Sequence, residues 1–121
     1  MLINELVQIA FNAACEKGFH APKPADKFRE DLATQLCNLG SEMSELWEAY
    51  RRGKLNDPCD KADGMIKLGF KPLTNFEEEL ADVVIRCADM AGFFGIDLEN
   101  AVKVKLAYNK SRPLRNGGKL A

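Results

Sequence analysis

The sequence contains few of the residues that usually build zinc sites or disulfide frameworks. Its 121 residues include one histidine, His20, and four cysteines, none of them in a Cys-x-x-Cys pair. A zinc site or a disulfide framework is therefore not expected. The cysteines are interpreted as reduced. Three of them, Cys15, Cys37 and Cys87, fall in apolar helical patterns and are predicted to fill the core.

Other absences narrow the function. There is no Gly-x-x-x-x-Gly-Lys-Ser/Thr phosphate loop. The single histidine is not part of a Glu-x-x-His motif, which argues against a ferritin-like di-iron bundle. A phosphohydrolase site of the His-Asp type would need several histidines, and the sequence has one.

Long hydrophobic runs are also missing. The most apolar stretch, residues 81–96, is interrupted by Asp82, Arg86 and Asp89, whereas a membrane-spanning helix needs roughly 20 apolar residues. The first residues carry Glu5 where an export signal has basic residues, so a cytoplasmic protein is expected. Lys and Arg number 17 against 18 Asp and Glu, and this balance argues against a general nucleic-acid or anionic-membrane binder.

What remains is the composition of one soluble helical domain. Hydrophobic residues make up 46% and charged residues 29% of the chain, and its length fits a single domain over residues 1–121. Strand signals are scarce, and residues 112–121 are predicted to form a flexible tail. A chain this short buries a modest core, so oligomerisation is a reasonable expectation from the start.

Helical periodicity and capping signals place four main helices. They are predicted over residues 4–16, 26 or 27–52, 74–94 and 98–110, and a short helix is predicted over residues 62–67 in the long 53–73 connection. Thr74 and Glu77 form a capping box, and Asp97 caps the last helix. The pattern indicates an all-α, four-helix-bundle-like fold. The second helix is expected to pack on other helices through an apolar stripe: Leu32, Leu36, Leu39, Met43, Leu46 or Trp47, and Tyr50.

Two predicted helices carry pairs of carboxylates on faces that should be buried. Glu42 and Glu45 lie three residues apart at the edge of the apolar stripe, and Glu79 and Asp82 repeat this spacing on the next long helix. If the pairs face each other, the four carboxylates repel and need divalent cations to persist ionised. Hard oxygen ligands favour Mg²⁺ or Mn²⁺. The competing interpretation is structural: Arg86 forms ion pairs with Asp82 and Asp89, and the glutamates are solvated.

The last helix offers charge of the opposite sign. Lys105, Asn109 and Arg112 recur at helical spacing on one face, and Lys and Arg are the usual ligands of phosphate. A solvated basic helix end, favoured by the helix dipole, explains the same residues without a ligand. Together with the carboxylates, the basic face suggests a metal that bridges to a polyphosphate.

Three sequence blocks follow one another along the chain: Glu42-Met43-Ser44-Glu45-Leu46, Glu79-Leu80-Ala81-Asp82-Val83 and Lys105-Leu106-Ala107-Tyr108-Asn109-Lys110-Ser111-Arg112-Pro113. In this order they resemble the MazG-like nucleoside triphosphate pyrophosphohydrolases, members of the all-α NTP pyrophosphatase superfamily. The pattern of that family is Glu-Glu-x-x-Glu, then Glu-x-x-Asp, then a Lys/Asn/Arg region. Ser41 stands where the family often has the first glutamate, and the 53–73 connection is long.

The resemblance implies Mg²⁺-dependent hydrolysis of a (d)NTP to the monophosphate and pyrophosphate, a housecleaning reaction of the nucleotide pool. It implies Glu42, Glu45, Glu79 and Asp82 as catalytic metal ligands, with Mn²⁺ as an alternative ion. Lys105, Asn109 and Arg112 would bind phosphate oxygens. It also implies a homodimer or a dimer of dimers, with sites near the subunit interface.

Some alternatives stay open on the sequence alone. Trp47, Phe19, His20 and Phe28 are candidates for stacking on the base, and core packing is the competing role for Trp47 and Phe28. A phosphoribosyl-ATP pyrophosphatase-like enzyme is a second enzymatic interpretation. A non-catalytic helical dimerisation module, whose acidic stripes form ion pairs, is the alternative from another class.

Overall fold

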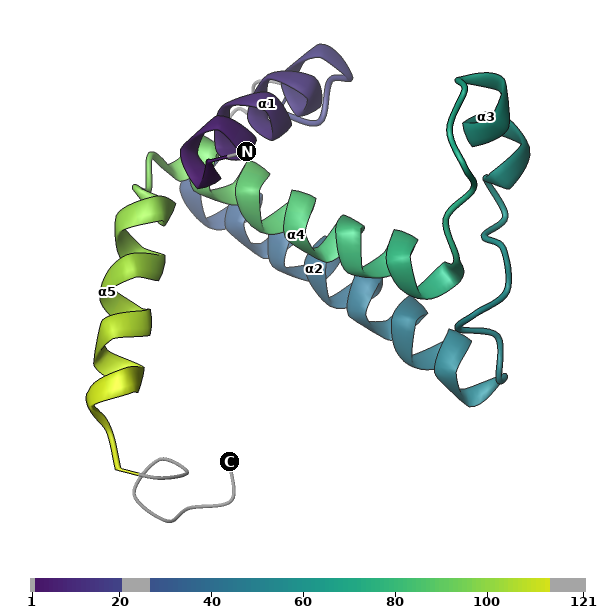
Figure 1. Ribbon diagram of the computed structural model, residues 1–121. Helices are drawn as coiled ribbons and strands as arrows, with labels where there is room; N and C mark the ends of the chain where they lie inside the picture. The colour runs from purple at the N-terminus through teal and green to yellow at the C-terminus, as the bar shows by residue number, and fades with distance from the viewer. Residues whose placement is uncertain (1, 21–26, 114–121) are drawn as a thin grey trace.

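The computed structural model describes residues 2–20 and 27–113, with the backbone alone for residues 27–30. Within these ranges the chain is all-helical, as predicted, apart from an isolated bridge between Pro58 and Thr74. The predicted tail, residues 112–121, lies mostly outside the described residues. The helices are α1 (Ile3–Glu16), α2 (Lys27–Arg51), α3 (Ala62–Lys67), α4 (Asn75–Phe94) and α5 (Leu98–Ser111) (Figure 1).

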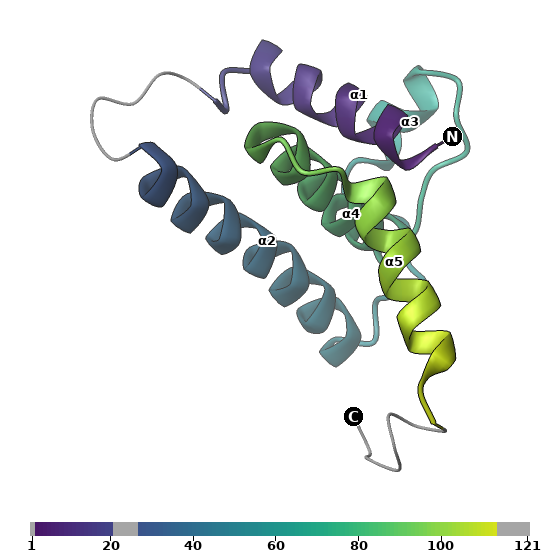
Figure 2. The same cartoon turned by 90° about the vertical axis from the view of Figure 1, so that its left-hand side faces the viewer.

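The fold centres on α4. The helices α2 and α4 lie side by side and run in opposite directions, and α1 packs against α4 next to them (Figures 1 and 2). The helix α5 packs on α1 and then extends away from the α2–α4 pair (Figure 1). The helix α4 is therefore central among the long helices, because α1 and α2 both contact it, although Leu80, Val84 and Ile85 on α4 stay exposed.

The ends of α4 follow the capping signals of the sequence. The Thr74 hydroxyl accepts a hydrogen bond from the Glu77 backbone N–H at 3.1 Å, and the Thr74 N–H donates to the Glu77 carboxylate at 2.9 Å. Gly95 ends the helix with a left-handed backbone, φ 67°. Asp97 then caps α5 by accepting from the Asn100 N–H at 3.1 Å. Each such cap stabilises its helix by about 1 kcal/mol.

The helix α1 is held at both ends by polar contacts. At its start, the Asn4 amide donates to Asp97 at 3.1 Å and accepts from the Glu99 backbone N–H at 3.3 Å. Beyond its end, His20 Nε2 lies 2.6 Å from Asp89 Oδ1. The His20 ring stands between Phe11 and Phe93, with centroids at 5.5 and 4.6 Å. These polar contacts therefore join the start of α1 to the start of α5, and the turn after α1 to the C-terminal part of α4.

Residues 52–74 form the α3 arm, which projects from the end of the α2–α4 pair (Figure 1). Its base is closed by the Cys59 N–H, which donates to the Leu73 carbonyl at 2.9 Å, and by the Asn75 amide, which donates to the Lys54 carbonyl at 2.9 Å. Lys61 forms an ion pair with the buried carboxylate of Glu78 on α4. The short helix predicted at residues 62–67 is confirmed.

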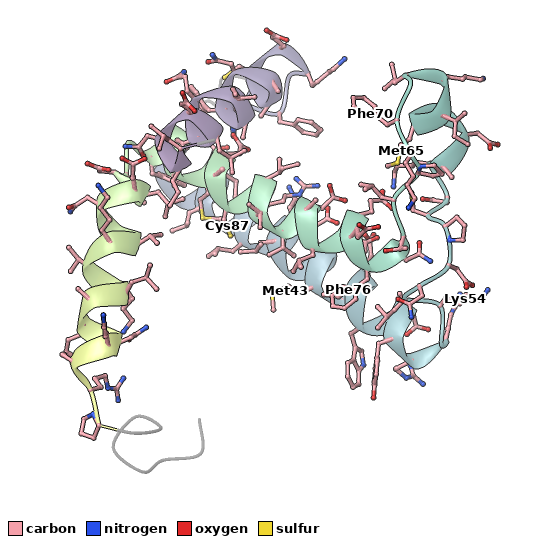
Figure 3. The ribbon with its side chains drawn as sticks, viewed as in Figure 1. Met43, Lys54, Met65, Phe70, Phe76 and Cys87 are labelled. Carbon is pink, nitrogen blue, oxygen red and sulfur yellow. The ribbon has the colours of Figure 1, made fainter. Side chains whose placement is uncertain are left out.

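Two predictions about the core are wrong. Cys15, Cys37 and Cys87 are exposed, and the buried cysteine is Cys59. Four members of the predicted apolar stripe of α2 are also exposed: Leu36, Met43, Trp47 and Tyr50. The physical reason is that α2 has α4 as its principal neighbour, so one side of the pair stays uncovered in a single chain. Figure 3 shows Met43 and Phe76 on that side, opposite α1 and the α3 arm.

The close approach of α1 to α4 depends on a glycine. A Cβ atom added to Gly92 would lie 2.6 Å from the Cβ of Phe11, far inside the normal contact distance. Because the Phe11 Cβ sits next to its own backbone, it cannot move aside without shifting α1. Gly92 therefore sets the distance between the two helices.

We expect Gly92→Ala to lower the free energy of unfolding by about 1–2 kcal/mol, because the overpacking exceeds the gain in helix propensity. The matched control is Gly40→Ala in α2, where an added Cβ has nothing within 4 Å. That change should raise stability by about 0.5–1 kcal/mol. Urea unfolding followed by circular dichroism measures both. A Gly92→Ala variant that is as stable as Gly40→Ala, or more stable, would contradict the close approach.

Candidate functional site

The antiparallel α2–α4 pair brings the two predicted carboxylate pairs together. Glu42, Glu45 and Glu79 each offer a carboxylate oxygen, and these atoms all lie within 4.8 Å of one another. We call these three residues the carboxylate cluster. Asp82, one turn further along α4, lies outside this set and lines the adjoining cleft together with Glu42. The structure thus brings three of the four predicted ligands into one group and places the fourth beside it.

The cluster is electrostatically strained without a counter-charge. Burial raises the pKa of Glu79 to about 7, and the nearby carboxylate of Glu45 adds to the rise. One Glu79 oxygen, Oε2, is buried and has no hydrogen-bond partner among the described residues. Burial also raises the pKa of Asp82, with the charges of Glu42 and Glu78 as further causes. At neutral pH the free protein therefore holds part of this cluster as neutral acid.

The residues fit a hard divalent cation. The donors are all carboxylate oxygens, which Mg²⁺ and Mn²⁺ prefer over softer metals. A cation would replace the proton on Glu79, offset the repulsion among the three glutamates and give the buried Oε2 a partner. Glu42, Glu45 and Glu79 are thus the candidate ligands, and Asp82 lines the cleft beside Glu42.

The ion pairs of α4 differ from those the structural interpretation predicts. Arg86 donates from Nε and Nη2 to Glu42 Oε1 at 3.2 and 3.1 Å, across the helix pair, and Asp89 pairs with His20. The expected pairing of Arg86 with Asp82 and Asp89 along its own helix is therefore wrong. The reason is geometric: Arg86 lies at the contact with α2, where the Glu42 carboxylate faces it.

A cleft of about 250 Å³ opens beside the carboxylates, between α1 and α4. We call it the α1–α4 cleft. Its walls are largely apolar, and its charged residues come from three elements. The lining comprises Ala10, Ala13, Ala14, Lys17, Phe19, Glu42, Asp82, Ile85, Arg86 and Asp89.

Lys17 and Arg86 are the cations that line this cleft, and sequence reasoning assigned neither to the phosphate. The signal for Lys17 was weak, because a lysine after a helix end is explained by the helix dipole alone. Arg86 stood in the polar stripe of its helix but was interpreted only as an ion-pair partner. His20 lies outside this lining, where it is buried against Asp89.

The predicted phosphate ligands lie elsewhere in a single chain. Lys105, Asn109 and Arg112 belong to α5 and its end, which extend away from the α2–α4 pair (Figure 1). Lys105 Nζ lies 5.1 Å and Arg112 Cζ 5.6 Å from the centre of the Tyr108 ring. One chain therefore does not bring the basic face of α5 to the carboxylate cluster.

Trp47 also lies outside the cleft. It is 60% exposed and stacks on Tyr50, with ring centroids 5.4 Å apart. It lines an apolar hollow on the uncovered side of the α2–α4 pair, together with Met43, Leu46, Leu55 and Phe76. Phe28 falls where the structure describes the backbone alone.

Comparison with known proteins found no matching family model, curated protein or solved structure. Among the described residues, no helix combines the length and the apolar character needed to cross a bilayer.

The raised pKa of Glu79 predicts how the metal-free protein responds to pH. The folded state holds a proton on Glu79 up to about pH 7, whereas the unfolded chain loses it near its ordinary value of 4.5. Its contribution to stability is therefore complete below about pH 4.5 and is lost as pH rises to about 7. Urea unfolding in excess chelator should show a midpoint that falls across this window.

Glu79→Gln cannot ionise, so it should flatten that fall and stabilise the metal-free protein above pH 7. The control is Glu48→Gln on α2, since Glu48 is exposed to solvent and pairs with Arg51 and Arg52 outside the cluster. This control should keep the wild-type slope. The same pH dependence in Glu79→Gln as in the wild type would show that the Glu79 proton does not stabilise the fold.

Proposed function

We propose that the chain is a Mg²⁺-dependent nucleoside triphosphate pyrophosphohydrolase of the MazG-like type, with nucleotide-pool housecleaning as its role. The observation that carries this proposal is the carboxylate cluster, whose oxygens converge within 4.8 Å at the edge of a cleft lined by Lys17 and Arg86. A carboxylate-held metal beside cations and an apolar cleft suits a triphosphate attached to a nucleoside. The order of the three sequence blocks supports the same assignment.

The reaction adds water across the α–β phosphoanhydride. The water oxygen bonds to the α-phosphorus, the bond from that phosphorus to the bridging oxygen breaks, and pyrophosphate leaves from the monophosphate. Mg²⁺, when bound, supplies a water of lowered pKa and offsets phosphate charge. Glu42, Glu45 and Glu79 would hold the ion, with Asp82 beside them.

The other residues of the cleft bind and orient the substrate. Lys17 and Arg86 offer positive charge to phosphate oxygens, where negative charge grows on the leaving pyrophosphate. Arg86 also holds the Glu42 carboxylate at the contact between α2 and α4. The apolar wall formed by Ala10, Ala13 and Ile85 suits the nucleoside and excludes bulk water from it.

A second copy of the chain completes the fold in this proposal. The uncovered side of the α2–α4 pair carries Leu36, Met43 and Trp47 from α2 and Leu80 and Val84 from α4, all exposed. A single chain rarely leaves so much apolar surface in one patch. Two α2–α4 pairs facing each other through this side make a four-helix bundle, and the dimer could pair again into a dimer of dimers.

The dimer also gives α5 a role. Because α5 projects from its own chain, it can reach toward another copy (Figure 1). Lys105, Asn109 and Arg112 would then act on phosphate oxygens at a site shared between subunits. The role of Trp47 in substrate binding is likewise a matter for the assembly, since it stands on the uncovered side.

A non-catalytic dimerisation module is the alternative, and one observation favours it. Arg86 already pairs with Glu42, so part of the acidic stripe has the structural partner that such a module needs. The ion pair between Arg86 and Glu42 provides no cation for Glu45 or Glu79. A metal-binding pyrophosphohydrolase explains why all three glutamates converge, whereas a dimerisation module explains Glu42 alone.

The test is release of pyrophosphate from canonical and modified (d)NTPs in Mg²⁺ or Mn²⁺. Activity should appear with either ion and disappear in excess chelator. Glu45→Gln and Asp82→Asn should each reduce turnover at least about 100-fold, because each removes charge at the reacting phosphate. Glu48→Gln, on the same helix as Glu45 and outside the cluster, should keep wild-type turnover.

Two results would contradict the proposal. Full turnover in excess chelator would exclude the metal assignment. Loss of the helical circular-dichroism signal in Glu45→Gln and Asp82→Asn would show that these residues maintain the fold, as the dimerisation module requires.

The assembly has its own test. Light scattering at micromolar concentration should give at least twice the 13.5 kDa mass of one chain. Met43→Glu, on the uncovered side of the α2–α4 pair, should shift the mass toward that of the monomer, because burying an unpaired carboxylate in an interface is energetically unfavourable. Leu68→Glu on the α3 arm, where Leu68 is 76% exposed, is the matched control and should leave the mass unchanged. A wild-type monomer with full activity would exclude the shared site.

A further inference from the structure

A second, smaller pocket lies behind the α1–α4 cleft. It has a volume of about 80 Å³ and shares Phe19, Arg86 and Asp89 with the cleft, so the two spaces adjoin. Its other lining residues are polar and come mainly from α2: His20, Asp31, Thr34, Gln35 and Asn38. We call it the inner pocket. The cleft is therefore apolar along its walls and polar at this end.

Gln35 is the unusual residue of the inner pocket. Its amide nitrogen and amide oxygen are both buried, and neither has a hydrogen-bond partner among the described residues. A buried amide that makes no hydrogen bond is costly, so native structures nearly always supply it with a partner. An apolar residue would pack at this position of α2 at no such cost. The amide is therefore explained best by a ligand that pairs with it.

The two volumes limit what can bind. A cavity of about 150 Å³ holds a benzene ring, so the 250 Å³ cleft accepts a planar ring and the 80 Å³ inner pocket does not. The inner pocket is still far larger than the roughly 10–15 Å³ that one water needs. It has room for the edge substituents of a ring that lies in the cleft.

The chemistry of the pocket favours hydrogen-bond donors on that ring. A glutamine amide offers a donor and an acceptor side by side, the arrangement that reads a base edge with two hydrogen bonds. Two carboxylates line the same pocket: Asp31, which is 4% exposed, and Asp89, which His20 holds at 2.6 Å. Carboxylates accept from exocyclic amino groups and disfavour keto oxygens.

We propose that the inner pocket reads the base of the nucleotide, with the Gln35 amide paired to the edge of a base that carries an exocyclic amino group. The base ring lies in the α1–α4 cleft, and its amino edge enters the inner pocket toward Asp89. This assignment rests on the proposed function for the identity of the ligand. It makes Gln35 a residue that recognises the base, beside the carboxylate of Asp89 and separate from the groups that act on phosphate.

The test uses nucleosides that differ only in this edge, so that neither metal nor phosphate takes part. Deoxycytidine is compared with deoxyuridine, and deoxyadenosine with deoxyinosine, by NMR titration of the wild-type protein. The amino-bearing member of each pair should bind more tightly by roughly 5- to 150-fold, the range for one two-bond base contact. Gln35→Met, which keeps the size of the side chain, should weaken binding of the amino-bearing nucleosides and lower both ratios.

Gln8→Met is the matched control, because Gln8 lies on the exposed surface of α1 and pairs with Asn12. It should keep the wild-type ratios. Gln35→Met should also unfold at the same temperature as the wild type or higher, since it removes an unpaired buried amide. This thermal result separates lost recognition from lost folding.

Three results would overturn the proposal: equal affinity for the members of both pairs in the wild type, wild-type ratios retained in Gln35→Met, or no measurable binding of any of the four nucleosides. Triphosphate hydrolysis without discrimination between these bases would leave the pyrophosphohydrolase standing and remove base reading by Gln35. Selective binding of nucleosides without any pyrophosphate release would support base reading by Gln35 and contradict the pyrophosphohydrolase.

Discussion

Three carboxylates at the contact between α2 and α4 repel one another, and much of the surrounding structure compensates for that repulsion. A contact between two helices is normally apolar, and an uncompensated charge there costs several kcal/mol. The chain offers Arg86 to Glu42 and leaves Glu79 to hold a proton, as its raised pKa of about 7 indicates. A divalent cation would replace the proton and bind all three glutamates together. In this view metal binding relieves a defect that folding leaves in place.

The same helix pair determines where a substrate has room. Gly92 on α4 lets Phe11 and the rest of α1 approach closely at one end. Near the carboxylates, the side chains of Ala10, Ala13 and Ala14 on α1 are too short to fill the space between α1 and α4, so a cleft remains. The cleft therefore has charged side chains of α2 and α4 on one wall and short apolar side chains of α1 on the other.

The sequence predicted the elements that depend on local chemistry. The Thr74 cap, the Gly95 end and the Asp97 cap are set by neighbouring residues, so they could be located from the sequence alone. The spacing of Glu42 with Glu45, and of Glu79 with Asp82, also placed each pair on one face of its helix, but it could not show that the two faces meet. The position of α5 depends on tertiary packing, so the helical periodicity of the sequence could not predict it. Within one chain the basic face of α5 lies far from the carboxylate cluster.

The wrong predictions have a common cause. The apolar stripe of α2 and Cys87 of α4 were assigned to the core because they lie in apolar helical patterns. Such a pattern does not show whether a helix face is buried within the chain or stays exposed. Gln35 was overlooked for a related reason. A glutamine within a helix is ordinary, and its buried, unpaired amide becomes visible only when α1 and α4 are placed beside it.

The attachment of α1 at both ends bears on the thermodynamics of recognition. Asn4 joins its start to the beginning of α5, and His20 joins the turn after its end to Asp89. A wall fixed at two points loses little conformational entropy when a ligand arrives, because folding has already restricted it. The cleft is therefore preorganised, and binding of a ligand there does not include the entropic cost of ordering α1. The binding affinity of such a site depends more directly on contacts with the ligand than it would if a mobile segment had to become ordered on binding.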